Sequence, residues 1–97
     1  MTLRIKFSPR ALADLDSIWD YTVGRWGEEQ GARYTRDIAA AVERIADNPL
    51  IGSDQENVRV GYRKIKSGSH AIYYRHSRHH VEVVRILHSS MGVGAAL

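Results

Sequence analysis

The chain has 97 residues, of which 43% are hydrophobic and 26% are charged, and a formal net charge of +3. This length allows a single domain, residues 1–97, with one modest core, and the composition is that of an ordinary soluble globular protein. The absence of cysteine excludes disulfides, thiolate metal sites and a thiol nucleophile.

The first half of the chain predicts a strand followed by a helical hairpin. Residues 3–7 alternate apolar and cationic side chains, which is the period of a half-buried strand. Ser8-Pro9 is a helix start signal, because serine caps free backbone N–H groups and proline suits the first helical position. We expect Gly27 to end this helix and Asn48-Pro49 to end a second helix that opens at Glu28. Helices joined by so short a connection are antiparallel neighbours.

Each predicted helix carries one apolar stripe at a spacing of three or four residues. The first stripe contains Leu12, Leu15, Trp19, Thr22, Val23 and Trp26. The second contains Tyr34, Ile38, Ala41, Val42 and Ile45. The two tryptophans are more typical of a core than of a cofactor pocket. Asp14 lies off the first stripe, near the positive end of the helix dipole, where an anion is mildly stabilising.

The second half of the chain predicts a small sheet. Residues 50–61 are polar with two glycines and indicate a surface loop. Three strands follow, at Tyr62–Lys66, His70–His76 and Val81–His88. Short connections at 67–69 and 77–80 make them hairpins. The expected fold is therefore α+β, in the order β-α-α-β-β-β, with a helical hairpin on one face of a mostly antiparallel sheet and the other face free.

Positive charge is concentrated in this sheet. Residues 58–91 contain seven Lys/Arg and a single acid, Glu82, whereas residues 1–57 contain seven Lys/Arg and ten Asp/Glu. A local excess of one sign attracts polyanions or acidic surfaces, and tyrosines beside it can stack on bases or anchor a peptide. The candidate binding face is lined by Arg63, Lys64, Lys66, Tyr73, Tyr74, Arg75, Arg85 and His88. Because side chains alternate along a strand, at most one of the two tyrosines can lie on it.

A metal-free ribonuclease is a second interpretation of the same residues. Cleavage of RNA through its own 2′-hydroxyl needs a base, an acid and cations for the phosphorane. The candidates are His88 or Glu82 as base, Lys64 or Lys66 as acid, and Arg75 or Arg85 as phosphate clamp. A histidine at a strand end is more often structural or merely exposed, and the residues alone favour binding over catalysis.

Other sites are disfavoured. His76, His79 and His80 crowd one turn, but no cysteine or acid joins them there, so no zinc site is expected. The segment 67–69 is a turn and not a phosphate-binding loop, and no GxGxxG pattern occurs. We expect no cofactor. The N-terminus lacks the apolar stretch of a signal peptide, and no segment reaches the length of a membrane span, so a cytoplasmic location is expected.

Several motifs together resemble one known family. They are D-x-x-x-I-W-x-Y at 14–21, G-Y-R at 61–63, G-S-H-x-I-x-Y-R at 68–75, and V-E-V-V-R-I-L-H at 81–88 with Met91 three residues beyond. Over roughly residues 5–91 the chain is similar to the ParE branch of the RelE/ParE toxin superfamily of type II toxin–antitoxin systems. The family's helical hairpin on a small antiparallel sheet agrees with the order of the predicted elements.

The resemblance implies a toxin that binds DNA gyrase, stalls replication and does not cut RNA. It implies a ParD-like antitoxin that neutralises the toxin in a hetero-oligomer, either a heterodimer or a heterotetramer. The C-terminal segment of such an antitoxin typically wraps its toxin as a helix plus an extended part, and Trp26 and Tyr34 are the expected anchors. The expected contacts with the target are Arg63, Arg75, Arg85, His88 and Met91.

The chain departs from the family pattern in two places. An acidic residue often follows the methionine, but Gly92 stands here, before an apolar VGAAL end, and this tail is implicated in toxicity. RelE-type nucleases carry a late catalytic tyrosine, but no tyrosine follows Tyr74. The alternative function, a RelE-like ribosome-dependent mRNA endonuclease, would use Lys64, Lys66, Arg75, Arg85 and His88. The missing tyrosine favours the non-enzymatic toxin, and a third option is an inert member kept for complex formation or operon regulation.

Overall fold

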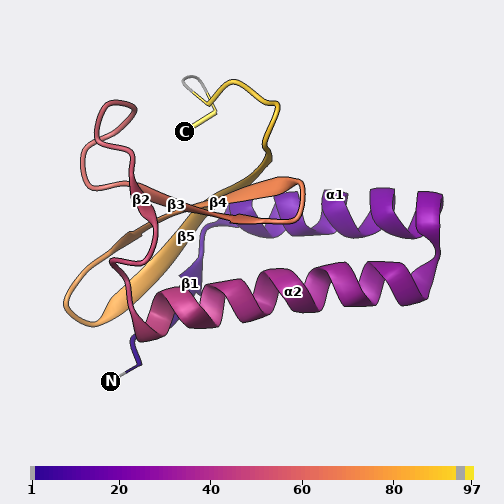
Figure 1. Ribbon diagram of the computed structural model, residues 1–97, viewed down its shortest axis with the longest axis horizontal. Coiled ribbons are helices and arrows are strands. Elements are labelled where there is room, and N and C mark those ends of the chain that lie inside the picture. Colours follow the sequence, from indigo (N-terminus) through magenta and orange to yellow (C-terminus); the bar gives the residue numbers. More distant parts are fainter. Residues whose placement is uncertain (1, 94–95) are drawn as a thin grey trace.

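The computed structural model describes residues 2–93 and 96–97. In this part of the chain the elements are β1 (Arg4–Phe7), α1 (Pro9–Trp26), α2 (Glu28–Asp47), β2 (Ser53–Asp54), β3 (Arg63–Ser67), β4 (His70–His76) and β5 (His80–His88). The helices form an antiparallel hairpin that lies against one face of the sheet and projects beyond it (Figure 1). The expected α+β architecture is confirmed. Neither described helix is long and apolar enough to cross a membrane.

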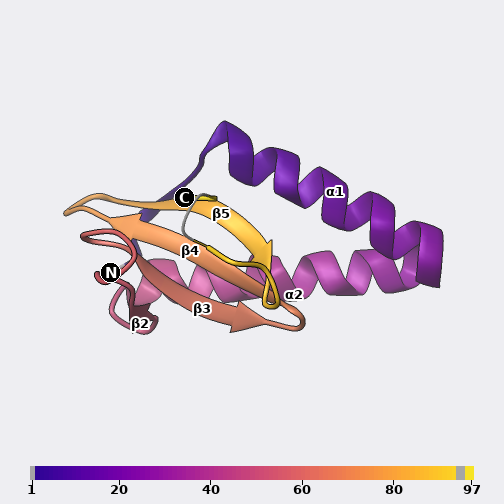
Figure 2. The same cartoon turned by 90° about the horizontal axis from the view of Figure 1, so that it is seen from above.

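The strands form one mixed sheet in the order β1-β5-β4-β3-β2. β1 runs parallel to β5, and the other pairings are antiparallel. Figure 2 shows β3, β4 and β5 side by side. The prediction that residues 50–61 form only a loop was wrong, because Ser53 and Asp54 pair with β3 as a short edge strand. Two polar residues show no apolar alternation, so the hydrophobic pattern could not reveal this strand.

A bulge interrupts the pairing of β4 with β5. Tyr73 pairs with Arg85, but Tyr74 pairs with Val83, which leaves Val84 as an extra residue in β5. The extra residue shifts the alternation by one, so Val83 and Ile86 both face the helices.

The helix ends agree with the capping signals. The Ser8 hydroxyl accepts a hydrogen bond from the Ala11 N–H (3.0 Å) and donates one to the Val84 carbonyl (2.6 Å), so this cap also fastens α1 to β5. Gly27 separates the helices with φ of +94°, a conformation that glycine adopts without strain. Its N–H closes the last turn of α1 on the Val23 carbonyl.

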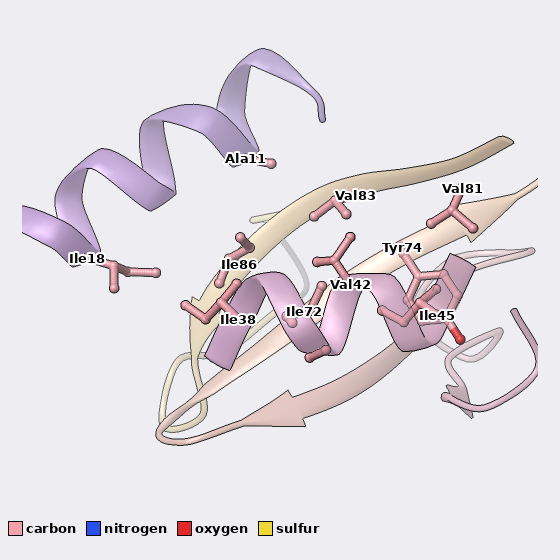
Figure 3. Close-up of a cluster of buried hydrophobic side chains, with 11 residues drawn as sticks. Ala11, Ile18, Ile38, Val42, Ile45, Ile72, Tyr74, Val81, Val83 and Ile86 are labelled. Atoms are coloured by element: carbon pink, nitrogen blue, oxygen red, sulfur yellow. The ribbon is translucent and has the colours of Figure 1, made fainter. Parts of the chain in front are cut away.

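The main core lies between the helical hairpin and the sheet (Figure 3). Its buried members come from all layers: Ala11 and Ile18 of α1, Ile38, Ala41, Val42 and Ile45 of α2, and Ile72, Tyr74, Val81, Val83 and Ile86 of the sheet. Burying such side chains contributes roughly 1.5–3 kcal/mol each, which makes this cluster the main source of stability.

The apolar stripe expected on α1 was partly wrong. The buried residues of α1 are Ala11, Ile18 and Thr22, and Leu15 of the stripe packs against the main core, whereas Trp19 is 38% exposed and Trp26 is 65% exposed. Trp19 instead packs on α2 at Gly31, where a Cβ atom would approach the Trp19 ring to 3.3 Å. The hairpin extends past the sheet, so the far end of α1 has no sheet to cover it (Figure 2).

The second face of the sheet, expected to be free, is partly covered by the end of the chain. Ala71, Tyr73 and Leu87 form a second buried cluster beneath Val93, Ala96 and Leu97. The end of the chain lies across the sheet opposite α2 (Figure 1). The apolar tail that the sequence showed therefore has an apolar surface to cover, although Gly94 and Ala95 within it lie outside the described residues.

Candidate functional site

A groove of about 390 Å³ lies between the second half of α1 and the ends of β4 and β5. It forms where α1 passes the edge of the sheet and leaves it. The lining residues are Asp14, Ser17, Ile18, Tyr21 and Thr22 of α1, His70 of β4, Arg85–His88 of β5, and Met91. Charged, imidazole and apolar side chains therefore meet in one concave surface, the usual composition of a binding site.

An ion pair of Asp14 with Arg85 forms one wall of this groove. Arg85 donates from Nε to Asp14 Oδ2 (2.7 Å) and from Nη2 to Oδ1 (2.8 Å), and both side chains are 14% exposed. Asp14 Oδ2 also accepts the Ile86 N–H at 2.9 Å. Because β1 ends opposite Val83, the rest of this edge of β5 lacks a strand partner, and the carboxylate satisfies the free donor. The hydrogen bond to Asp14 raises the pKa of Arg85.

Two histidines line the other end of the groove, and a tyrosine outside the groove contacts one of them. Tyr34 Oη lies 2.5 Å from His70 Nδ1 and accepts the Ser69 N–H at 2.9 Å. The ring of His70 makes edge-to-face contacts with Tyr34 and with His88, at centroid distances of 5.5 and 5.4 Å. Burial lowers the pKa of His70, the nearby His88 lowers it further, and Asp14 partly opposes both. This environment therefore disfavours the protonated form of His70.

The hydrogen bonds of His88 determine what this side chain can do. Its Nδ1 accepts the Ser90 N–H at 3.2 Å and lies 2.7 Å from Ser90 Oγ. A neutral imidazole that accepts at Nδ1 carries its proton on Nε2. The remaining nitrogen is therefore a hydrogen-bond donor, which suits recognition of an acceptor better than general-base catalysis.

The predicted nuclease residues do not converge. Lys64 and Lys66 pair with Tyr73 and Ala71 on the face that the tail covers, whereas His88 lies in the groove. Arg75 is engaged with Glu82, its Nε lying 2.7 Å from Glu82 Oε1, and this contact raises the pKa of Arg75.

Arg63 and the two tyrosines of the candidate face have internal roles. Arg63 donates to the Gly52 carbonyl at 2.7 Å and holds the loop that follows α2. Tyr74 is fully buried and donates to the Pro49 carbonyl while accepting the Gly52 N–H. Tyr73 is 3% exposed beneath the tail. The two tyrosines lie on opposite faces of the sheet, as strand alternation predicted, but neither is on an open face, because Tyr74 packs in the main core and the tail covers Tyr73.

The structure thus brings three of the five expected target contacts, Arg85, His88 and Met91, into the groove, and leaves Arg63 and Arg75 elsewhere. Of the expected antitoxin anchors, Trp26 is exposed at the far end of α1, whereas Tyr34 is half-buried and holds the β3–β4 turn.

Sequence reasoning did not predict three groove residues, Asp14, Tyr21 and His70. A signal existed for the first two, because they begin and end the D-x-x-x-I-W-x-Y motif. Seven residues are nearly two helical turns, so both side chains lie on one face of α1.

Comparison with known proteins defines the family. The model of the ParE toxin of type II toxin–antitoxin systems, parDE, matches residues 5–93. Toxin ParE1 of Caulobacter vibrioides is 49% identical over 92 residues, which are 95% of each chain. Toxin ParE1 of Mycobacterium tuberculosis is 44% identical over 94 residues, which are 96% of each chain.

Solved structures share the fold. A chain of the chromosomal ParDE system from P. aeruginosa superposes with a TM-score of 0.77 at 22% identity, covering 90% of this chain and 96% of that one. A chain of the toxin–antitoxin complex RelBE2 from Mycobacterium tuberculosis superposes with a TM-score of 0.63 at 20% identity, covering 91% and 99%. The fold and the matches over nearly the full length define the toxin of a type II toxin–antitoxin system. Within that class, the chain belongs to the ParE toxin family.

Proposed function

We propose that this toxin binds and inhibits DNA gyrase, and that a ParD-like antitoxin neutralises it. Membership of the ParE family supports the proposal. The observation that supports it most directly is the groove, whose described residues present hydrogen-bond donors beside exposed apolar groups.

The groove has the chemistry of a protein-binding surface. Tyr21 is 64% exposed and Met91 is 53% exposed, and both flank Arg85 and His88. Tyrosine, methionine and arginine are the side chains enriched in protein interfaces. With a donor at His88 Nε2 beside them, the groove would receive an apolar side chain of the target next to a polar or acidic one.

An exposed line of apolar side chains along α1 would receive the antitoxin. Leu12, Trp19 and Trp26 are 51%, 38% and 65% exposed, and a spacing of seven places them in one line along the helix. Such a line of anchors fits an amphipathic helix of a partner. The antitoxin would continue towards Tyr34 at the junction of α2 with the sheet.

The alternative function, ribosome-dependent mRNA cleavage, has less geometric support. The lysines that would act as acids lie on the tail-covered face, and Nδ1 of His88 already accepts from Ser90. Of the predicted nuclease set, Arg85 and His88 are among the described residues that line the groove, whereas Arg75 and both lysines are not.

One experiment distinguishes the two functions. Purified protein is tested in a gyrase supercoiling and cleavage-complex assay, and in parallel for translation-dependent cleavage of a reporter mRNA. We expect inhibited supercoiling or trapped cleaved DNA with intact message, and relief when the antitoxin is added. Cleaved message with unaffected gyrase would overturn the proposal and make His88 a catalytic candidate.

Substitutions locate the contact surface. His88→Ala and Met91→Ala should weaken gyrase inhibition at least tenfold, while Arg36→Ala on the exposed side of α2 serves as the control. Equal activity of all three variants would exclude the groove as the gyrase contact.

A further inference from the structure

A second concentration of charge lies at the opposite end of the sheet from the groove. We name it the basic patch, and it consists of Arg4, Lys6, Arg75, Arg78 and His80. His80 of the patch opens β5 and His88 of the groove ends it, so these two residues lie about 26 Å apart at ~3.3 Å per residue. None of the four cations at this end lines the groove, and only Arg75 was among the expected target contacts.

The sheet register brings the patch together. Arg4 pairs with His80, and Lys6 pairs with Glu82, which in turn pairs with Arg75. Lys6, Glu82 and Arg75 therefore form a row across three adjacent strands, on the face away from the helices. A hollow of about 260 Å³ lies over this row. The Arg4 N–H also bonds the His79 carbonyl at 3.0 Å, which places the turn that carries Arg78 beside β1.

The charge of the patch is not balanced within the described residues. Glu82 pairs with Arg75 at 2.7 Å, and the side chain of Arg75 is still 57% exposed. In the same part of the chain, no carboxylate comes within 4 Å of the side-chain nitrogens of Arg4, Lys6 or Arg78. Clustered cations repel one another, and a polyanion removes that repulsion when it binds.

The surroundings of the patch indicate the kind of polyanion. Protein interfaces centre on buried apolar or aromatic anchors, but the large apolar side chain nearest in sequence, Ile5, pairs with Val81 on the helix face. Single-stranded nucleic acids stack their bases on exposed aromatic rings, but Tyr62 and Tyr73 on this face are 8% and 3% exposed. Cations without either feature suit the phosphates of a duplex, which are bound through charge alone.

We propose that the basic patch binds the phosphodiester backbone of duplex nucleic acid, without reading its sequence. The site is independent of the gyrase groove. It would hold the toxin on nucleic acid through Arg4, Lys6, Arg75 and Arg78, with Glu82 orienting the guanidinium of Arg75.

The test is fluorescence anisotropy of the full chain with labelled 20-base-pair DNA and RNA duplexes of random sequence, at several salt concentrations between 50 and 200 mM. Each phosphate contact contributes about 0.9 to the slope of log K against log salt. The variant Arg4→Gln/Lys6→Gln/Arg78→Gln should bind at least tenfold more weakly at the lowest salt, with a slope smaller by about 2–3. Binding of either duplex supports the site, and the duplex that binds more strongly identifies whether the ligand is DNA or RNA.

The control variant is Arg33→Gln/Arg36→Gln/Arg44→Gln, which removes three exposed cations from α2. Its net charge therefore equals that of the triple variant of the basic patch. It should keep the wild-type slope. Arg78→Gln alone, in a turn outside the strands, should lower the slope by about 1 if the triple variant does not fold. The proposal is overturned by no binding at 50 mM salt, by equal losses in the two triple variants, or by a polyglutamate competitor as effective as duplex at equal charge.

Discussion

Asp14 and Arg85 lie 71 residues apart in the chain and form a two-point ion pair at 2.7 and 2.8 Å. The same carboxylate accepts the Ile86 N–H, and the same guanidinium donates to the Ala96 carbonyl at 2.8 Å. The pair therefore joins α1, the edge of β5 and the end of the chain. Arg85 is at once a groove residue and a structural residue, so a loss of activity in its variants is informative only beside a measurement of stability.

We expect Asp14→Ala to lower the free energy of unfolding by about 3 kcal/mol, because it leaves a mostly buried guanidinium and a strand N–H without partners. The double variant Asp14→Ala/Arg85→Ala should lose less than the sum of the single losses. Urea denaturation measures both. The exposed ion pair of Arg75 with Glu82 provides the control, because Arg75→Ala should lower the free energy of unfolding by about 1 kcal/mol or less. Additive losses at Asp14 and Arg85 would mean that the two side chains do not interact.

His70 should make stability depend on pH. Burial and His88 lower its pKa in the folded protein, with Asp14 opposing, whereas in the unfolded chain it titrates near 6.5. The unfolded state thus binds a proton that the folded state rejects, and the stability present above pH 6.5 is lost as the pH falls through the folded pKa.

Urea midpoints measured from pH 8 to pH 5 test this dependence. The variant His70→Asn, which keeps an acceptor for Tyr34, should have a flatter profile than the wild type, whereas His79→Asn, in the exposed turn, should keep the wild-type slope. His88→Ala should raise the pKa of His70 and reduce the loss. An unchanged profile in His70→Asn would assign the dependence to other groups.

The elements were predictable from the sequence because their signals are local. The alternation before Ser8, the Ser8-Pro9 cap and the positive φ of Gly27 each depend on a few neighbouring residues. The expectation of a cationic face followed from composition, and one of its expected members, Arg75, lies in register with Glu82 and Lys6, although Lys6 was not among those members.

The contacts between distant segments were not predictable in this way. Nothing near Tyr73 indicates that Val93 and Leu97 will cover it, and nothing near Asp14 indicates a guanidinium from β5. Asp14 was assigned to the helix dipole, but it lies beyond the first turn and acts through direct hydrogen bonds. Pairing across the fold depends on register and on the bulge at Val84, and neither has a local signal.

Two glycines should respond to alanine with opposite signs. A Cβ at Gly52 would lie 2.5 Å from Tyr74 Oη and 2.7 Å from the Lys64 carbonyl oxygen, so Gly52→Ala should displace the loop and lower stability by about 2 kcal/mol or more. A Cβ at Gly24, inside α1, meets nothing within 4 Å, so Gly24→Ala should raise stability by up to about 1 kcal/mol. Thermal unfolding of both variants measures the difference, and a neutral Gly52→Ala would show that the loop adapts freely.

The tail should contribute to stability through its apolar contacts. Val93 packs on the cluster of Ala71, Tyr73 and Leu87, so Val93→Asp should lower the free energy of unfolding by about 1–3 kcal/mol. Gly92→Asp is the control, because open space surrounds that position and the change should stay within about 0.5 kcal/mol. It also restores the acid that often follows the methionine in the family, so its growth arrest should equal or exceed that of the wild type. Equal stability of both variants would show that the tail does not hold to the sheet in solution.

The exposed line on α1 should determine the affinity for the antitoxin. Trp26→Ala removes an exposed side chain, so the fold should remain intact while binding of the cognate antitoxin weakens by about 1–3 kcal/mol, or roughly 5- to 150-fold. Leu12 lies at the opposite end of the line from Trp26, about two turns before Ile18. Leu12→Ala should weaken antitoxin binding less than Trp26→Ala. The control is Val60→Ala, since Val60 is 80% exposed in the loop before β3 and lies outside this line. Calorimetric titration of each variant measures the affinities, and a Trp26→Ala protein that binds as tightly as Val60→Ala would place the antitoxin on another surface.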